Sequence, residues 1–137
     1  MRIDQKQIQA LAGFRNALRR FLAFSEEVTR SEGLTAQQYQ AMLAIKAAPH
    51  GLLSIGELGA ELLLRPNAAV QLVDRLSTQG LVQRQRSESS RRVVNITLTE
   101  VGDTLLLRLA ALHVEQLSKR RKQLADIVRQ LKRVHTH

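Results

Sequence analysis

The sequence predicts a mainly α fold with a small β wing, in which a helix-turn-helix lies between long helices. Apolar residues recur every three or four positions at both ends of the chain. In the middle, a proline opens a short helix, and two strand-like runs then flank a polar turn. We expect one domain, residues 1–137, with a helix-turn-helix lobe at 34–99 between long helices at 1–33 and 100–137.

Composition limits the class of protein. Of the 137 residues, 44% are hydrophobic and 24% are charged, as in an ordinary soluble domain. The absence of cysteine excludes disulfides, thiolate metal sites and a cysteine redox switch. The net charge of +9 favours a polyanionic partner, either nucleic acid or an anionic membrane.

The sequence shows no membrane or secretion segment. The longest apolar run, Leu105 to Leu112, contains Arg108 and is far shorter than the roughly 20 residues that span a bilayer. The N-terminal segment MRIDQKQIQA has no apolar signal core. We therefore expect a cytoplasmic protein with no membrane partner.

One long helix is predicted over residues 5–31, and Gly33 is placed to end it in a left-handed conformation. Its apolar stripe, extended backwards by Ile8, needs a partner surface. The stripe consists of Leu11, Phe14, Leu18, Phe21, Ser25 and Val28.

Two capping boxes predict the starts of the next two helices. Thr35 is followed three residues later by Gln38, and Ser54 is followed in the same way by Glu57. Gly59 lies inside the second of these helices, where glycine costs about 1 kcal/mol relative to alanine. A close approach between helices would explain it.

The helix predicted at residues 66–79 begins with Pro66, which suits the first helical position, and is closed by Gly80. Strands are expected at 81–86 and 93–97, joined by the polar turn 87–90 and an arginine pair. One side of the helix is apolar, with Ala69, Leu72, Val73 and Leu76.

A last helical region is predicted from Thr99 to about Val134. Leucines repeat there every seven residues, at 117, 124 and 131, with Ile127 beside them. The basic run Arg120-Arg121-Lys122 interrupts the pattern, so we expect a bend or an exposed face near it.

This order of elements suits binding to double-stranded DNA. The helix opened by proline would enter the major groove, where Asn67 and Gln71 can hydrogen-bond to adenine. Ala68 and Val70 could touch thymine methyl groups, and Arg65 with the free amides of the helix start could hold phosphate.

The wing would carry Arg91 and Arg92 into the neighbouring minor groove, whose narrow A·T tracts attract arginine. Residues 65–99 contain six arginines against Asp74 and Glu88, an excess that favours the same partner. The candidate DNA-binding residues are Arg65, Pro66, Asn67, Ala68, Val70, Gln71, Arg75, Arg84, Arg86, Arg91 and Arg92.

Each feature also has a structural interpretation. Helix pairs occur in many proteins, Asn67 or Gln71 alone is more often a solvated residue, and Arg84 and Arg86 fit a hydrated strand face. The combination in this order favours DNA binding. The alternative is a helical protein-interaction module without specific DNA binding, whose apolar stripes dock another protein.

The segments LTAQQYQAML, IGELGAELLL, VQLVDRLSTQGLVQRQ and RRVVNITLTEVG together resemble the MarR family of winged helix-turn-helix transcriptional regulators. The resemblance covers nearly the whole chain. It implies a homodimeric repressor on a palindromic operator, with interlocked N- and C-terminal dimerisation helices. The implied dimerisation residues are Ile8, Leu11, Phe14, Leu18, Leu117, Leu124, Ile127 and Leu131.

The wing departs from the family pattern. Ser87 and Ser90 stand where the family usually has aspartates, one of which precedes the arginine pair. Serine suits a turn, but the Asp–Arg ion pair that would orient a wing arginine is missing.

The resemblance also implies a small effector, often aromatic and anionic, that releases the DNA. A structural or solvated role is favoured for each candidate lining residue. These residues are Arg15, Arg19, Phe21, Tyr39 and His113.

No catalytic constellation is apparent. The histidines at 50, 113, 135 and 137 lack ligand spacing with a nearby carboxylate, which favours surface or structural roles over metal binding. A phosphate-binding glycine loop, a Gly-x-Ser-x-Gly motif and a paired-acid site are all absent from the sequence. We therefore predict no enzyme activity, no cofactor and no metal.

Overall fold

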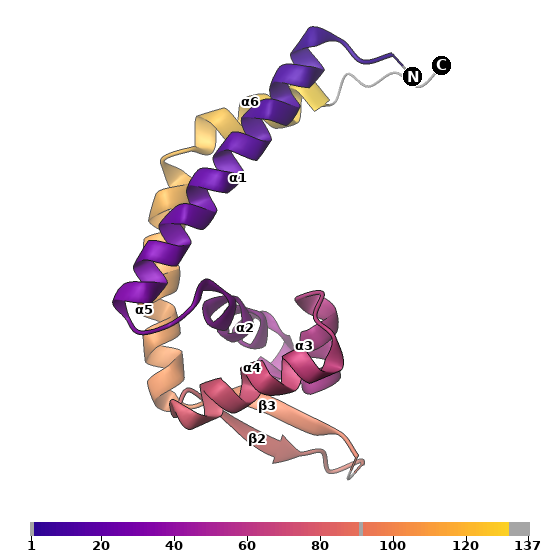
Figure 1. Ribbon diagram of the computed structural model, residues 1–137, viewed down its shortest axis with the longest axis vertical. Coiled ribbons are helices and arrows are strands. Elements are labelled where there is room, and N and C mark those ends of the chain that lie inside the picture. Colours follow the sequence, from indigo (N-terminus) through magenta and orange to yellow (C-terminus); the bar gives the residue numbers. More distant parts are fainter. Residues whose placement is uncertain (1, 91, 132–137) are drawn as a thin grey trace. The chain divides into compact units, whose positions relative to one another are not determined.

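The computed structural model describes residues 2–90 and 92–131, and its helices and three short strands confirm the predicted fold class (Figure 1). Of the positions singled out above, Arg91, Val134, His135 and His137 lie outside the described residues. The elements are α1 (Gln5–Ser31), α2 (Ala36–Ala47), η1 (Pro49–Gly51), β1 (Leu52–Ser54), α3 (Ile55–Glu61), α4 (Pro66–Thr78), β2 (Val82–Arg86), β3 (Val94–Leu98), α5 (Glu100–Ser118) and α6 (Arg121–Leu131).

The chain divides into two compact units. The helical unit comprises residues 1–28 and 111–137, and the winged unit comprises residues 29–110. Each unit is built around its own buried side chains.

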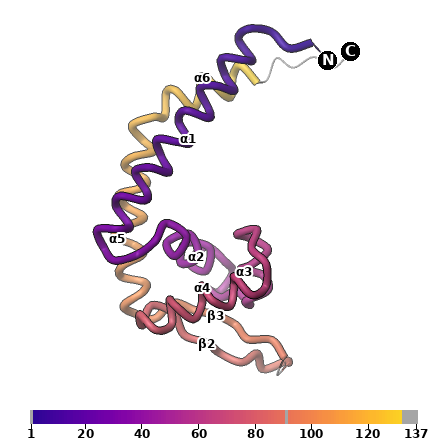
Figure 2. The backbone as a smooth tube through the Cα atoms, viewed as in Figure 1, coloured from indigo at the N-terminus to yellow at the C-terminus, as the bar shows by residue number. Residues whose placement is uncertain are grey.

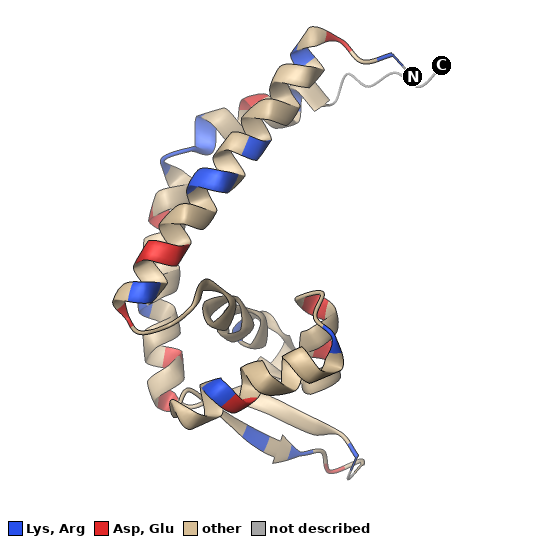
Figure 3. Cartoon of the chain, in the orientation of Figure 1, with Lys and Arg blue, Asp and Glu red and all other residues tan. Residues whose placement is uncertain are grey.

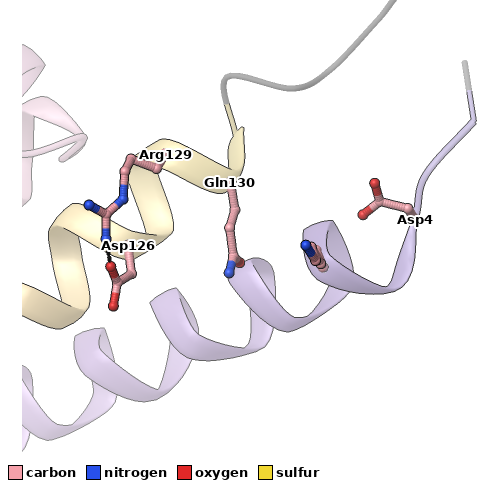
Figure 4. A pocket seen from close by; sticks show the side chains of 5 residues that line it. Asp4, Asp126, Arg129 and Gln130 are labelled. Carbon is pink, nitrogen blue, oxygen red and sulfur yellow. Dashed lines mark ion pairs between the residues drawn. The ribbon is translucent and has the colours of Figure 1, made fainter.

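In the helical unit, α1 begins with a capping box that the sequence reasoning missed. The Gln7 amide donates to Asp4 Oδ1 at 2.8 Å, and the Asp4 amide donates to Gln7 Oε1 at 3.0 Å. A pocket of about 270 Å³ separates this first turn from α6, and Figure 4 shows Gln130 pointing from α6 toward α1. The break predicted near Arg120 is present, because α5 ends at Ser118 and α6 begins at Arg121.

Small and polar residues form the buried face of α1. Ala10 and Ala17 are buried, as are Gln7 and Ser25. The bulky stripe is instead exposed in the single chain, with Leu11 52% and Phe14 48% accessible, and Leu18 is exposed as well. The part of the predicted stripe formed by Leu11, Phe14 and Leu18 is therefore left uncovered in the single chain, whereas Ser25 lies on the buried face.

The winged unit confirms both predicted capping boxes. The Gln38 amide donates to Thr35 Oγ1 at 3.0 Å, and the Glu57 amide donates to Ser54 Oγ at 3.0 Å. The return bonds to the Gln38 and Glu57 side chains are also formed. The expected left-handed glycines are found at both helix ends, with φ of 75° at Gly33 and 74° at Gly80.

A three-stranded antiparallel sheet follows the order β1-β3-β2, and Figure 2 traces the chain through it. The central strand carries Ile96, fully buried, which pairs with Leu53 on β1 and Arg84 on β2. Strands β2 and β3 match the two predicted strands to within one residue at each end. The sequence reasoning missed β1, because three residues are too few to show an alternating pattern.

The predicted close approach at Gly59 is present. A Cβ at this position would lie 3.3 Å from the Ala69 Cβ of α4 and 3.4 Å from the Leu64 carbonyl oxygen. Glycine therefore lets α3 and α4 cross at short distance, which sets the angle of the helix pair.

A second close approach joins the start of α5 to the end of α4. The Thr99 hydroxyl donates to the Gly80 carbonyl at 2.6 Å and accepts from the Gly102 amide at 3.0 Å. The Thr99 amide donates to the Leu81 carbonyl at 3.0 Å. A Cβ on Gly102 would lie 2.9 Å from the Leu81 carbonyl carbon and closer still to its oxygen.

Replacing Gly102 by alanine is expected to lower the free energy of unfolding by about 1–3 kcal/mol, because backbone must move to admit the methyl group. Urea unfolding of the two proteins measures this loss. Gly56→Ala is the matched control: its Cβ would meet only Ser54 Oγ, at 3.9 Å, so the variant should be as stable as the parent or more so. Equal stability of Gly102→Ala and the parent would contradict the close approach.

Candidate nucleic-acid interface

Helix α4 has two distinct faces. One face packs into the core of the winged unit through Ala69, Leu72, Val73 and Leu76, all buried. The opposite face is exposed, and it carries the sequence-predicted residues Asn67, Ala68, Val70, Gln71 and Arg75. The outer face is therefore a row of small and polar side chains, and the opposite face of the helix is packed against the core.

The start of α4 is open to an anion. Pro66 occupies its first turn, and Arg65 is the N-cap residue, although its side chain makes no capping hydrogen bond. Both residues are exposed. The partial positive charge of a helix N-terminus and the adjacent guanidinium together favour a phosphate at this end.

The turn between α3 and α4 contains a feature that the sequence did not indicate. Leu63 adopts a left-handed conformation, with φ of 56°, and its side chain is 92% exposed. The chain can turn this tightly because the Leu64 amide donates to the Gly59 carbonyl at 2.8 Å. A positive φ is strained for a leucine, so the tight turn between α3 and α4 lowers the stability of the fold.

An ion pair joins α4 to the wing. Arg84 on β2 donates to Asp74 on α4, and both side chains are partly exposed. The sequence reasoning assigned Arg84 to DNA, but the structure directs its guanidinium to Asp74. The two residues are ten positions apart on different elements, so no local pattern could reveal this pair.

Among the described residues, two further predicted wing arginines, Arg86 and Arg92, belong to the hairpin of β2 and β3 (below α4 in the view of Figure 1). Arg86 and Arg92 are exposed, and Figure 3 shows the basic colouring of β2 and of the wing. Serine hydroxyls close the turn: Ser87 Oγ lies 2.9 Å from Ser89 Oγ, and the Arg92 amide donates to Ser90 Oγ at 3.3 Å.

The predicted effector residues are divided between the two units. In the helical unit, Phe21 stacks edge-on against the buried His113, with ring centroids 5.6 Å apart, and His113 Nε2 hydrogen-bonds with Ser25 Oγ at 2.9 Å. Arg15 and Arg19 are exposed. In the winged unit, Tyr39 is buried in the core, and burial raises the pKa of its hydroxyl.

Among the described residues, no three His, Asp or Glu side chains gather as potential metal ligands. No helix in this part of the chain is long and apolar enough to cross a membrane.

These features define a winged helix-turn-helix protein, and comparison with known proteins shows which family its central segment matches. A model described as the MarR family matches residues 32–93. The resemblance drawn from the sequence is confirmed over this segment, which matches the MarR family and folds as a winged helix-turn-helix. The family consists of transcription regulators, not enzymes.

Two curated relatives are from Bacillus subtilis. The HTH-type transcriptional repressor MdtR is 30% identical over 77 residues, which is 56% of this chain and 48% of MdtR. The organic hydroperoxide resistance transcriptional regulator is 36% identical over 72 residues, 53% of this chain and 48% of the relative. The chain thus matches about half the length of each relative.

Solved structures share the fold. A mutant of MarR from E. coli, solved in complex with operator DNA, has a TM-score of 0.71 at 22% identity. The alignment covers 87% of this chain and 85% of the MarR chain.

The backbone N–H of Ser54 and, to a smaller extent, its side chain lower the pKa of Glu57. Replacing Ser54 by alanine keeps the backbone donor and removes the side chain, so we expect the pKa of Glu57 to rise only part of the way toward its ordinary value. A lowered folded-state pKa stabilises the protein at neutral pH, and this contribution is lost as the pH falls through that pKa. The stability difference between variant and parent should therefore shrink in acid.

A pH titration of the Glu57 carboxyl carbon by NMR measures the shift. Thr35→Ala is the matched control, because it removes the equivalent cap of α2, whose partner Gln38 does not titrate. An unchanged Glu57 pKa in Ser54→Ala would contradict the contribution of the Ser54 side chain to the lowered pKa.

Proposed function

We propose that this chain forms a homodimer that binds double-stranded DNA sequence-specifically and represses transcription. One observation carries the proposal: α4 exposes a polar and small-residue face while its opposite face is anchored in the core. A helix of this kind can enter a major groove without exposing apolar core residues to the duplex.

The relatives support the same conclusion. MdtR is named a transcriptional repressor, and the MarR mutant was solved with operator DNA. We extend these properties to the present chain and assign base contacts to Asn67 and Gln71 and a phosphate contact to Arg65.

In the wing, Arg86 and Arg92 are the arginines that we assign to DNA contacts. Arg84 receives a different role in the proposal. Because its guanidinium is paired with Asp74, it holds the base of the wing against α4 and so fixes the distance between the two DNA-contacting elements.

Dimerisation is assigned to the long helices at 1–33 and 100–137. The exposed apolar residues support it, because Ile8, Leu11, Phe14 and Leu18 on α1 form one continuous unburied stripe. Leu117 and Leu131 are exposed as well, and Leu124 is half-buried. Ile127 is excluded from this assignment, because it is buried and lies 3.8 Å from the position of a Cβ on Gly13 of its own chain.

The operator can be identified by selecting bound fragments from random duplex DNA. A two-fold dimer is expected to select a palindrome with half-sites about one helical turn apart. Recovery of no preferred sequence would reject the proposal and favour a protein-interaction role.

On the selected operator, replacing Arg92 by alanine should weaken binding and reduce the salt dependence by about one unit per lost phosphate contact. Fluorescence anisotropy at several salt concentrations measures both effects. Arg30→Ala is the matched control, because Arg30 is an exposed arginine of the same unit outside the candidate interface. If both variants kept the affinity of the parent, the wing assignment would fail.

Replacing Gln71 by alanine should change the preferred sequence, with a loss of about 1–3 kcal/mol at one base pair per half-site. A repeated selection with the variant reads out this change. A uniform loss of affinity on all sequences would reassign Gln71 to the DNA backbone.

Replacing Phe14 by aspartate should dissociate the dimer, because a charge would be buried in the proposed apolar interface. Light scattering coupled to size exclusion gives the mass in solution. Leu63→Asp is the control, because Leu63 is also an exposed apolar residue but lies in the α3–α4 turn. A dimer that persisted in Phe14→Asp would contradict the assignment of the stripe.

A further inference from the structure

A small cavity in the winged unit contains none of the candidate DNA-binding residues. Its volume is about 280 Å³, and it lies where the end of α2, the η1 turn, the end of β3 and the start of α5 meet. Charged groups of both signs line it, namely Lys46, Glu100 and Asp103, together with His50 and Thr97.

Thr97 supplies the observation that distinguishes this cavity. Its hydroxyl oxygen is buried and has no hydrogen-bond partner among the described residues. Buried hydroxyl groups in proteins nearly always have such a partner, because an unsatisfied one destabilises the fold. A polar ligand in the adjoining cavity would provide it.

The backbone at the border of the cavity is also unusual. His50 adopts a left-handed conformation, with φ of 61°, directly before the left-handed Gly51. Non-glycine residues in this conformation are uncommon and are concentrated at binding sites. The conformation places an exposed imidazole on the same cavity as Lys46.

The charges select the class of ligand. Lys46 Nζ lies 2.7 Å from Asp103 Oδ1, and both side chains are partly exposed, so either can exchange its partner for a ligand. Glu100 would repel a simple anion, and Lys46 would repel a simple cation. A small molecule that carries both charges satisfies all three groups.

A second cavity, of about 270 Å³, also has charges of both signs, but none of its lining side chains has a buried polar atom without a partner. It lies between α1 and α6 in the helical unit, and its carboxylates are already engaged. Asp4 accepts from the Gln7 amide, and Asp126 pairs with Arg129 (Figure 4).

We propose that the cavity at Thr97 binds a small zwitterion of the α-amino acid class. The ligand carboxylate pairs with Lys46 and His50 and accepts a hydrogen bond from the Thr97 hydroxyl. The ligand ammonium pairs with Glu100 and Asp103. This site does not depend on DNA binding, so its test uses the protein alone.

The test is a two-dimensional ¹H–¹⁵N NMR titration of the full chain with glycine and with larger L-amino acids. Saturable shifts of the amide signals of Thr97 and Glu100 are expected with at least one of them. Acetate and ethylammonium, each with only one of the two charges, should shift these signals far less. No shift with any amino acid, or equal shifts with acetate, would overturn the proposal.

Variants separate binding from structure. Glu100→Gln should weaken binding of the responsive amino acid about tenfold, the effect of losing one charge-assisted hydrogen bond. Glu32→Gln is the matched control, since Glu32 pairs with Arg108 and does not line this cavity. Thr97→Val should weaken binding while leaving the unfolding midpoint unchanged or higher, whereas a purely structural Thr97 would leave binding unchanged.

Discussion

The winged unit depends on the close approach of Gly102 to Leu81. Thr99 makes two hydrogen bonds at this junction. Its hydroxyl donates to the Gly80 carbonyl at 2.6 Å, and its amide donates to the Leu81 carbonyl at 3.0 Å. These bonds fix the end of α4, the start of β2 and the start of α5 to one another. Since α4 and the wing branch from this junction, its geometry determines where both elements of the proposed DNA interface point.

The local elements follow closely from the sequence. Both winged-unit capping boxes, the start of α4 at Pro66 and the closing Gly80 were predicted, because each depends on residues within three or four positions. The contact explaining Gly59 was also predicted, because a mid-helix glycine implies a close neighbour.

The features that the sequence reasoning missed are those that depend on folding. Asp74 and Arg84 meet only after β2 has packed beside α4, and β1 exists only because β3 offers it an edge. Likewise, small residues such as Ala10 and Ala17, not the bulky stripe, face the interior of the helical unit. A stripe of large apolar residues therefore marked a surface left open by the single chain, and spacing alone could not distinguish the two faces.

The serine turn of the wing changes the electrostatics of the proposed interface. Ser90 Oγ accepts from the Arg92 amide at 3.3 Å, as an aspartate there could, but it supplies no counter-charge for the guanidinium. The charge of Arg92 is therefore not offset by a carboxylate at position 90, which favours rapid association with a polyanion. An arginine without a fixed partner also loses more side-chain entropy when it binds, up to roughly 2 kcal/mol. Serine at position 90 thus favours long-range attraction over a preformed contact, and in the proposed complex sequence discrimination would depend mainly on α4.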